Sequence, residues 1–280
     1  MNLAHHVDEI ADRERLLLVI AAIPIAVLSL GALLIPDAFA HLAGAVGSEP
    51  YIYRLVGAAA LGYAAALVWA LRGKRWSRVR LLVASLLGFS ACGALGAILQ
   101  LFSGDTKGIV YVILVLGLLV GALTAYLLYA HRAAPRPEAN IHNWLVGFFA
   151  VATLVALPFA LVPLFFPAAF GQFFGLRADD LLLYRLGGAE LAGYVVLGVL
   201  EIQSRNEAEI HPAAIMVLFF NAMAVLASLL ALLAGERSSL IYVVLVVSGV
   251  IAVVTLVQLT RRTGGNVFGD DEYPAAQPAS

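Results

Sequence analysis

The chain has 280 residues, of which 62% are hydrophobic and only 12% are charged. Average soluble domains carry about 25% charged residues, so this composition excludes a soluble globular protein, a disordered chain and a nucleic-acid-binding protein. The formal net charge of −1 marks no acidic or basic binding surface, and the composition predicts an integral membrane protein whose first partner is the lipid bilayer.

Segments long enough to cross a membrane follow one another along the chain. A helix needs about 20 mostly apolar residues to span the hydrocarbon core. Eight such segments are bounded by polar, Pro or Gly residues: 16–35, 53–71, 81–101, 108–128, 144–166, 183–202, 213–233 and 239–259. The loops that begin at Pro36 and Pro167 are mostly apolar, and we expect each to lie flat on the outer interface as a short helix.

The two halves of the chain match one another at a fixed offset. Shifting the sequence by 131 positions aligns Pro, Gly, Tyr and Arg residues as well as the common apolar ones: Pro36 with Pro167, Gly44 with Gly175, Tyr53-Arg54 with Tyr184-Arg185, and Gly62-Tyr63 with Gly193-Tyr194. Each half contains four predicted spans, and an even number gives both halves the same orientation. The predicted fold class is therefore an all-α integral membrane protein with eight transmembrane helices as two parallel four-helix repeats.

This repeat defines the predicted organisation of the chain. Residues 16–132 form the first four-helix repeat and residues 144–262 the second, separated by a polar, proline-containing linker at 133–143. Residues 1–15 and 263–280 are predicted to be a terminal segment and a solvated tail. Twelve of the 17 Lys and Arg residues flank the side that carries both termini. By the positive-inside rule both termini are predicted to be cytoplasmic, and the expected location is a bacterial inner membrane.

Glu190 is the first candidate for a functional residue, because an ionisable side chain inside a span is costly and by default suggests a function. Its mate in the first repeat is Ala59. On a helix, Tyr194 and Glu201 lie about 40° and about 20° from Glu190, which predicts a polar stripe from mid-membrane to the cytoplasmic end. Three roles are open for Glu190: a neutral carboxyl hydrogen-bonded within the bundle, with Asn221 as a candidate partner, a ligand- or proton-linked group, or a contact to a partner subunit.

Arg54 and Arg185 occupy the same position in the two repeats, next to the outer interface. One interpretation is structural: the two side chains extend to the headgroup region or pair with Glu49 and with Asp179 or Asp180. The other interpretation makes both arginines anchors for an anionic lipid headgroup or ligand.

The sequence contains no motif for a cofactor or a catalytic centre. None of the six histidines lies in the middle of a span, no lysine lies within a span, and the single cysteine, Cys92, rules out a disulfide within the chain or a CxxC redox pair. No metal site and no cofactor are predicted, and an enzyme is the least favoured class of function.

A short motif in the second repeat resembles a known family. Arg185 is followed by Gly188, then by Glu190-Leu191 and Gly193, a pattern similar to that of DoxX-like small four-helix bacterial membrane proteins. The resemblance implies a tandem duplication of that four-helix unit. It implies little biochemistry, because such proteins are largely uncharacterised or act as accessory components, and this chain lacks the cysteines that a thiol-redox role would need.

Two classes of function follow. The first is a non-catalytic polytopic membrane protein, an accessory or scaffold subunit that packs against other membrane subunits. The alternative is a small transporter or a protein that binds a hydrophobic small molecule, namely a lipid, a quinone or a pigment, in the cleft between the repeats.

Overall fold

The computed structural model describes residues 8–42, 44, 49–134, 141–177 and 179–262. These residues form ten helices: α1 Asp12–Leu34, α2 Pro36–Leu42, α3 Pro50–Ala70, α4 Trp76–Phe102, α5 Gly108–Ala130, α6 Asn143–Phe165, α7 Pro167–Phe173, α8 Leu181–Ser204, α9 Glu207–Leu233 and α10 Ser239–Arg262. Eight of the ten are long and apolar enough to cross a membrane. The prediction of an all-helical chain with eight membrane-spanning helices is confirmed at this level.

The two remaining helices, α2 and α7, have seven residues each and begin at the two prolines that end the first and fifth spans. The expected short helices in these loops are therefore present. Parts of the predicted terminal segments and linker, namely residues 1–7, 135–140 and 263–280, lie outside the described residues.

Some helices begin earlier than the apolar segments that predicted them. α4 begins at Trp76 and α9 at Glu207, five and six residues before the predicted spans. The first turn of α4 is held by Asp8, which accepts hydrogen bonds from the amide of Trp76 at its backbone oxygen (2.7 Å) and from the amide of Ser77 at Oδ1 (3.0 Å). Such capping satisfies the free amides of a helix start, so a helix extends beyond the apolar residues that the lipid requires.

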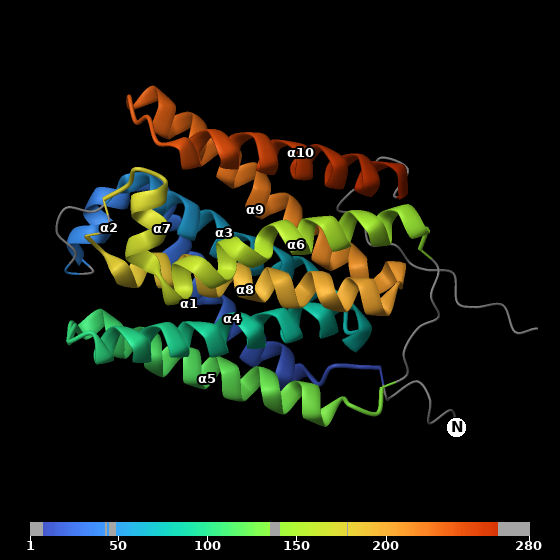
Figure 1. Cartoon of the computed structure of the whole chain (residues 1–280). Coiled ribbons are helices and arrows are strands. Elements are labelled where there is room, and N and C mark those ends of the chain that lie inside the picture. The colour runs from blue at the N-terminus through green and yellow to red at the C-terminus, as the bar shows by residue number, and fades with distance from the viewer. Residues whose placement is uncertain (1–7, 43, 45–48, 135–140, 178, 263–280) are drawn as a thin grey trace, which may run out of the picture.

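Four central helices are surrounded by four outer ones (Figure 1). α3 packs against α9, α4 packs against α8, and the pairs α3–α8 and α4–α9 also touch at the centre. The outer helices α1, α5, α6 and α10 pack on α3, α4, α8 and α9, respectively. α1 begins and α10 ends at one end of the bundle, called here the terminal face, and α2 and α7 lie at the opposite end, called here the short-helix face.

The crossing of α3 and α8 fixes the middle of the bundle. The hydroxyl of Tyr63 on α3 donates to the backbone oxygen of Glu190 on α8, and the hydroxyl of Tyr194 on α8 donates to the backbone oxygen of Ala59 on α3, both at 3.0 Å. Gly193 makes this approach possible, because a Cβ at that position would collide with the Tyr63 hydroxyl. The backbone of Glu190 is thus held by a neighbouring helix.

The helix boundaries of the two halves correspond closely. α6, α7 and α9 begin and end 131 residues after α1, α2 and α4. The contacts correspond as well: α1 packs on α3 as α6 packs on α8, and α4 packs on α5 as α9 packs on α10.

Candidate functional site

A mostly apolar cavity of about 190 Å³, called here cavity 1, lies between α1, α3, α4, α5 and α8. Its wall is made largely of aliphatic and aromatic side chains from these helices, among them Leu28, Val56, Phe89 and Ile113. The loop residues Asp105, Lys107 and Asp180 also line it. An apolar chamber with few polar groups is the usual form of a small-molecule site.

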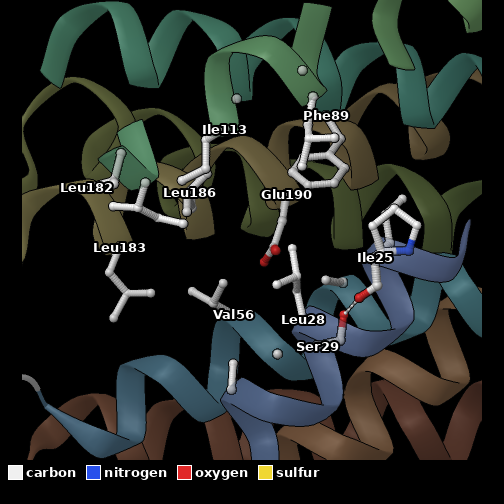
Figure 2. A pocket seen from close by; sticks show the side chains of 18 of the residues that line it. Ile25, Leu28, Ser29, Val56, Phe89, Ile113, Leu182, Leu183, Leu186 and Glu190 are labelled. Atoms are coloured by element: carbon white, nitrogen blue, oxygen red, sulfur yellow. Dashed lines mark hydrogen bonds between the residues drawn. The ribbon is translucent and has the colours of Figure 1, made fainter. Parts of the chain in front are cut away.

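The side chain of Glu190 points into cavity 1 (Figure 2). Glu190 is the tenth of the 24 residues of α8 and is only 3% exposed. Its Oε2 atom is fully buried and has no hydrogen-bond partner among the described residues. A buried polar atom without a partner is destabilising by about 1–3 kcal/mol, so this carboxyl is available for a group that enters the cavity.

The expected hydrogen bond between Glu190 and Asn221 is not formed. The Asn221 side chain instead donates through Nδ2 to the backbone oxygen of Val217, one turn earlier on α9, at 2.8 Å. Side chains of this type readily bond to a carbonyl four residues before them, and this local bond replaces the predicted one between helices.

Two further cavities lie near Glu190: cavity 2 extends toward the short-helix face, and cavity 3 extends toward the terminal face. Cavity 2, about 150 Å³, lies between α3, α6, α8, α9 and α10 and is lined by both Glu190 and Asn221. Cavity 3, about 100 Å³, lies between α6, α8, α9 and α10 and is lined by Asn221, Tyr194 and Glu201. All four residues predicted as ligand- or proton-linked candidates therefore line one chain of cavities, although Glu190 and Asn221 do not bond to each other.

Cavity 2 occupies the position in the second half that cavity 1 occupies in the first. Shifted by 131 residues, Phe39 and Phe89 of cavity 1 become Phe170 and Phe220 of cavity 2. The correspondence does not include the carboxyl group. Glu190 lines cavity 1, and the matching residue of cavity 2, 131 positions earlier, is Ala59.

Arg54 is paired within the protein, although not with the predicted acid. Its Nη1 lies 3.7 Å from Oε1 of Glu236, in the loop between α9 and α10. Burial raises the pKa of Glu236, while the nearby Arg54 charge opposes that rise. The predicted partner Glu49 instead accepts a hydrogen bond from the amide of Arg177 at 2.8 Å.

Arg185 is paired through an amide. Its Nη1 donates to Oε1 of Gln100, and Gln100 in turn donates through Nε2 to Oδ2 of Asp105 at 2.9 Å. Burial acts to raise the pKa of Asp105, but the hydrogen bonds from Gln100 and the Lys107 amide, together with the Lys107 charge, lower it. The predicted partner Asp180 is bonded to Tyr53 instead, at 2.8 Å. Each arginine thus connects to the last loop of the other half of the chain, because α3 packs beside α9 and α8 beside α4, an arrangement that favours a structural role.

Sequence reasoning did not single out Tyr63, which holds the backbone of Glu190. The signal was present, since Tyr63 is the mate of the candidate Tyr194 at the offset of 131 residues. The sequence also did not show which apolar residues form the walls of cavity 1. Aliphatic residues that line a cavity look the same in sequence as those that face lipid.

Comparisons of the chain with protein-family models, with curated proteins and with solved structures returned no match. The resemblance to DoxX-like proteins stays a prediction that depends on the short motif around Glu190.

Proposed function

We propose that this protein binds a lipophilic small molecule that carries a hydrogen-bond donor or a positive charge, with the apolar part in cavity 1 and the polar group at Glu190. The observation that carries the proposal is the buried carboxyl oxygen of Glu190, which lines an apolar cavity of about 190 Å³ and has no partner among the described residues. Ionisable groups within membrane-spanning helices are seldom retained without a function.

The size of cavity 1 limits the class of ligand. An engineered apolar protein cavity of about 150 Å³ binds benzene, so cavity 1 has room for one ring or a short chain end. A quinol ring, a phenol or an amine with a short apolar substituent fits this description. A whole phospholipid does not fit, although the end of one of its chains does.

A route from the bilayer supports a lipophilic ligand. α1 and α5 both line cavity 1, yet they do not form one of the packed helix pairs of the bundle. A ligand dissolved in the membrane would enter between such helices without crossing water, which suits a binding protein or a carrier.

We also propose that the two halves are parallel repeats with both termini in the cytoplasm of a bacterial inner membrane. Support for the repeats comes from the equal offset of three helix pairs, from the matching helix contacts and from the paired cavities. Support for the orientation comes from the Lys and Arg residues that flank the terminal face.

The scaffold class stays a prediction with less support. The outer helices α5, α6 and α10 expose many apolar side chains, and a lipid bilayer covers such faces as well as a partner subunit does. A scaffold does not explain an unpartnered carboxyl inside a cavity.

Retention of a bound molecule during purification tests the proposal. The protein is extracted in a mild detergent and examined by native mass spectrometry, followed by extraction and identification of any small molecule. Gly93 lines cavity 1 and a Cβ there would meet only one Phe89 ring atom, at 3.9 Å, so Gly93→Leu fills the cavity from α4. Gly249→Leu is the matched control, because a Cβ at Gly249 meets no atom within 4 Å and the residue lines none of the three cavities.

The proposal predicts a bound small molecule near one per chain in the parent and in Gly249→Leu, and its loss in Gly93→Leu. Equal retention in both variants would place the molecule elsewhere and contradict the proposal. A stoichiometric partner chain with no bound small molecule would support the scaffold class instead.

A further inference from the structure

A second buried carboxyl lies on the same helix as Glu190. Glu201 is three residues before the end of α8, is 3% exposed, and its Oε1 atom has no hydrogen-bond partner among the described residues. It lines cavity 3. Eleven residues separate the two glutamates, which corresponds to about 16 Å along a helix on nearly the same face.

Cavities 2 and 3 adjoin one another between these two carboxyls. Six residues line both cavities: Ala152, Ala156, Leu191, Phe220, Asn221 and Ile251. Glu190 lines cavity 2 and Glu201 lines cavity 3. With volumes of about 150 and 100 Å³, each cavity has room for several water molecules, since one water needs roughly 10–15 Å³ measured in this way.

Polar side chains are spaced along this route. Asn221 stands where the two cavities meet, Ser248 lines cavity 2, and Thr255 lines cavity 3. Water in a protein interior needs two to four polar partners. In cavity 2, whose wall is otherwise mostly apolar, Glu190, Asn221 and Ser248 supply them, and in cavity 3 Tyr194, Glu201 and Thr255 are among them.

The other titratable groups around the route are few. Cavity 2 adds Tyr184 from α8, and cavity 3 adds Tyr194 from α8 and His211 from α9. Tyr63 from α3 bonds to the Glu190 backbone, while α6 and α10 contribute no titratable side chain to either wall.

At its outer end cavity 1 is lined by Asp105, Lys107, Asp180 and Tyr53. Beyond Glu201, at the terminal face, Ser204 and Arg80 both bond to Glu209, with an Arg80–Glu209 distance of 2.7 Å.

We propose that Glu190 and Glu201 are the two ends of a proton pathway from cavity 1 to the terminal face. The O–H bond of the Glu190 carboxyl breaks, the proton moves along water in cavities 2 and 3, and the Glu201 carboxylate binds it. Glu201 then releases the proton to water at the terminal face. No electrons are transferred, and the net result is one proton moved and one negative charge left at Glu190. This goes beyond ligand binding, and it links the occupancy of cavity 1 to proton uptake or release on one side of the membrane.

Hydrogen–deuterium exchange of the Glu190 carboxyl tests the pathway. The protein is reconstituted in phosphatidylcholine vesicles, and infrared spectroscopy follows the band of protonated carboxyl groups after transfer to D₂O. The part of this infrared band that is absent in Glu190→Gln is assigned to the Glu190 carboxyl. The test variants are Glu201→Gln, which keeps the shape of the side chain, and Asn221→Leu, which removes the polar group that the two cavities share. The control is Glu14→Gln, because Glu14 is a buried carboxyl of α1 that lines none of the three cavities.

The pathway predicts that Glu201→Gln and Asn221→Leu slow the exchange of the Glu190 band about tenfold or more, while Glu14→Gln leaves it unchanged. Equal rates in the parent and in either test variant would overturn the pathway. So would a parent spectrum without a band that Glu190→Gln removes, because Glu190 would then hold no proton. The measurement needs no ligand, and Glu201→Gln should still retain any molecule bound in cavity 1, so a failed pathway and a failed binding site give different results.

Discussion

At the scale of single residues, Glu190 is held in place by its backbone and left free at its side chain. Its carbonyl accepts a hydrogen bond from Tyr63, whereas its carboxyl Oε2 has no partner among the described residues. A buried carboxyl without a partner lowers the stability of the folded protein. Residues that are kept for function often lower stability in this way.

Replacing Glu190 by leucine should therefore stabilise the protein. Glu190→Leu keeps most of the volume and removes an unpartnered buried carboxyl, so we expect unfolding to require about 1–3 kcal/mol more free energy than in the parent. Thermal unfolding in detergent measures the change. A loss of stability would mean that the carboxyl has a partner, and the proposed site would lack its free acceptor.

The loop residue Glu236 should give the folded protein a specific pH dependence. Burial raises its pKa in the folded state, so the folded protein binds this proton more tightly than the unfolded chain does. The resulting stability is present below the ordinary glutamate pKa and is lost as the pH rises through the raised value. We expect Glu236→Gln to lose less stability than the parent as the pH rises above about 4.3. Melting temperatures of both proteins across this range check the prediction, and parallel curves would contradict it.

The sequence predicted the importance of some site residues but not the contacts of others. Glu190 stood out because a carboxyl in an apolar span is rare, and its lining of cavity 1 agrees with a ligand-linked role. The partners of Arg54 and Arg185 were not predictable, because they depend on which helices of the two halves are neighbours. The Asn221 side chain bonds to a backbone carbonyl of its own helix and not to the predicted partner, Glu190.

At the scale of helices, close approach of backbones decides the packing. A Cβ at Gly188 of α8 would lie 2.6 Å from the backbone oxygen of Ala160 on α6, and one at Gly57 of α3 would lie 2.6 Å from that of Ser29 on α1. Small residues allow membrane helices to pack this closely. These contacts hold α1 and α6, which form walls of cavities 1 and 2.

Adding one methyl group at these contacts should separate the helices. We expect Gly188→Ala and Gly57→Ala each to lower stability by about 1–3 kcal/mol, the usual effect of overpacking. Gly249→Ala serves as the control, because a Cβ at that position meets no atom within 4 Å. Thermal unfolding of the three variants measures the difference. Unchanged stability in Gly188→Ala would show that α6 moves away from α8 easily.

The sequence predicted the helices better than their ends. Eight apolar segments gave the eight long helices, and the prolines gave the starts of α2 and α7. The early starts of α4 and α9 could not be read from apolar length, because a helix that leaves the hydrocarbon no longer needs apolar residues. Helix caps such as that of Asp8 on α4 depend on a contact between distant parts of the chain.

At the scale of the whole molecule, the two halves are interleaved. α3 packs on α9 and α8 packs on α4, so each inner helix has its main inner neighbour in the other half. Sequence patterns could not predict this arrangement, because faces that touch lipid and faces that touch protein are both apolar in a membrane. Cavity 1 results from it, since α8 closes a space whose other walls come from the first half.

The proposed orientation gives a direct labelling test. Arg75→Cys lies at the start of α4 at the terminal face, and Asp179→Cys precedes α8 at the short-helix face. With Cys92 replaced by alanine, a membrane-impermeant maleimide added to intact cells should label only Asp179→Cys. Arg75→Cys should react only after the membrane is permeabilised. Labelling of both positions in intact cells would contradict the orientation.

A matched pair of probes tests directly whether Glu190 acts as the hydrogen-bond acceptor for a ligand in cavity 1. 4-Propylphenol carries a hydrogen-bond donor, and propylbenzene has almost the same shape without one. Binding of each is measured to the parent and to Glu190→Leu in lipid nanodiscs. In Glu190→Leu the phenol O–H is buried without an acceptor, which costs about 1–3 kcal/mol, so the phenol should bind the parent at least about fivefold more tightly than Glu190→Leu, while propylbenzene binds both alike. Equal binding of the phenol to the two proteins would contradict the account.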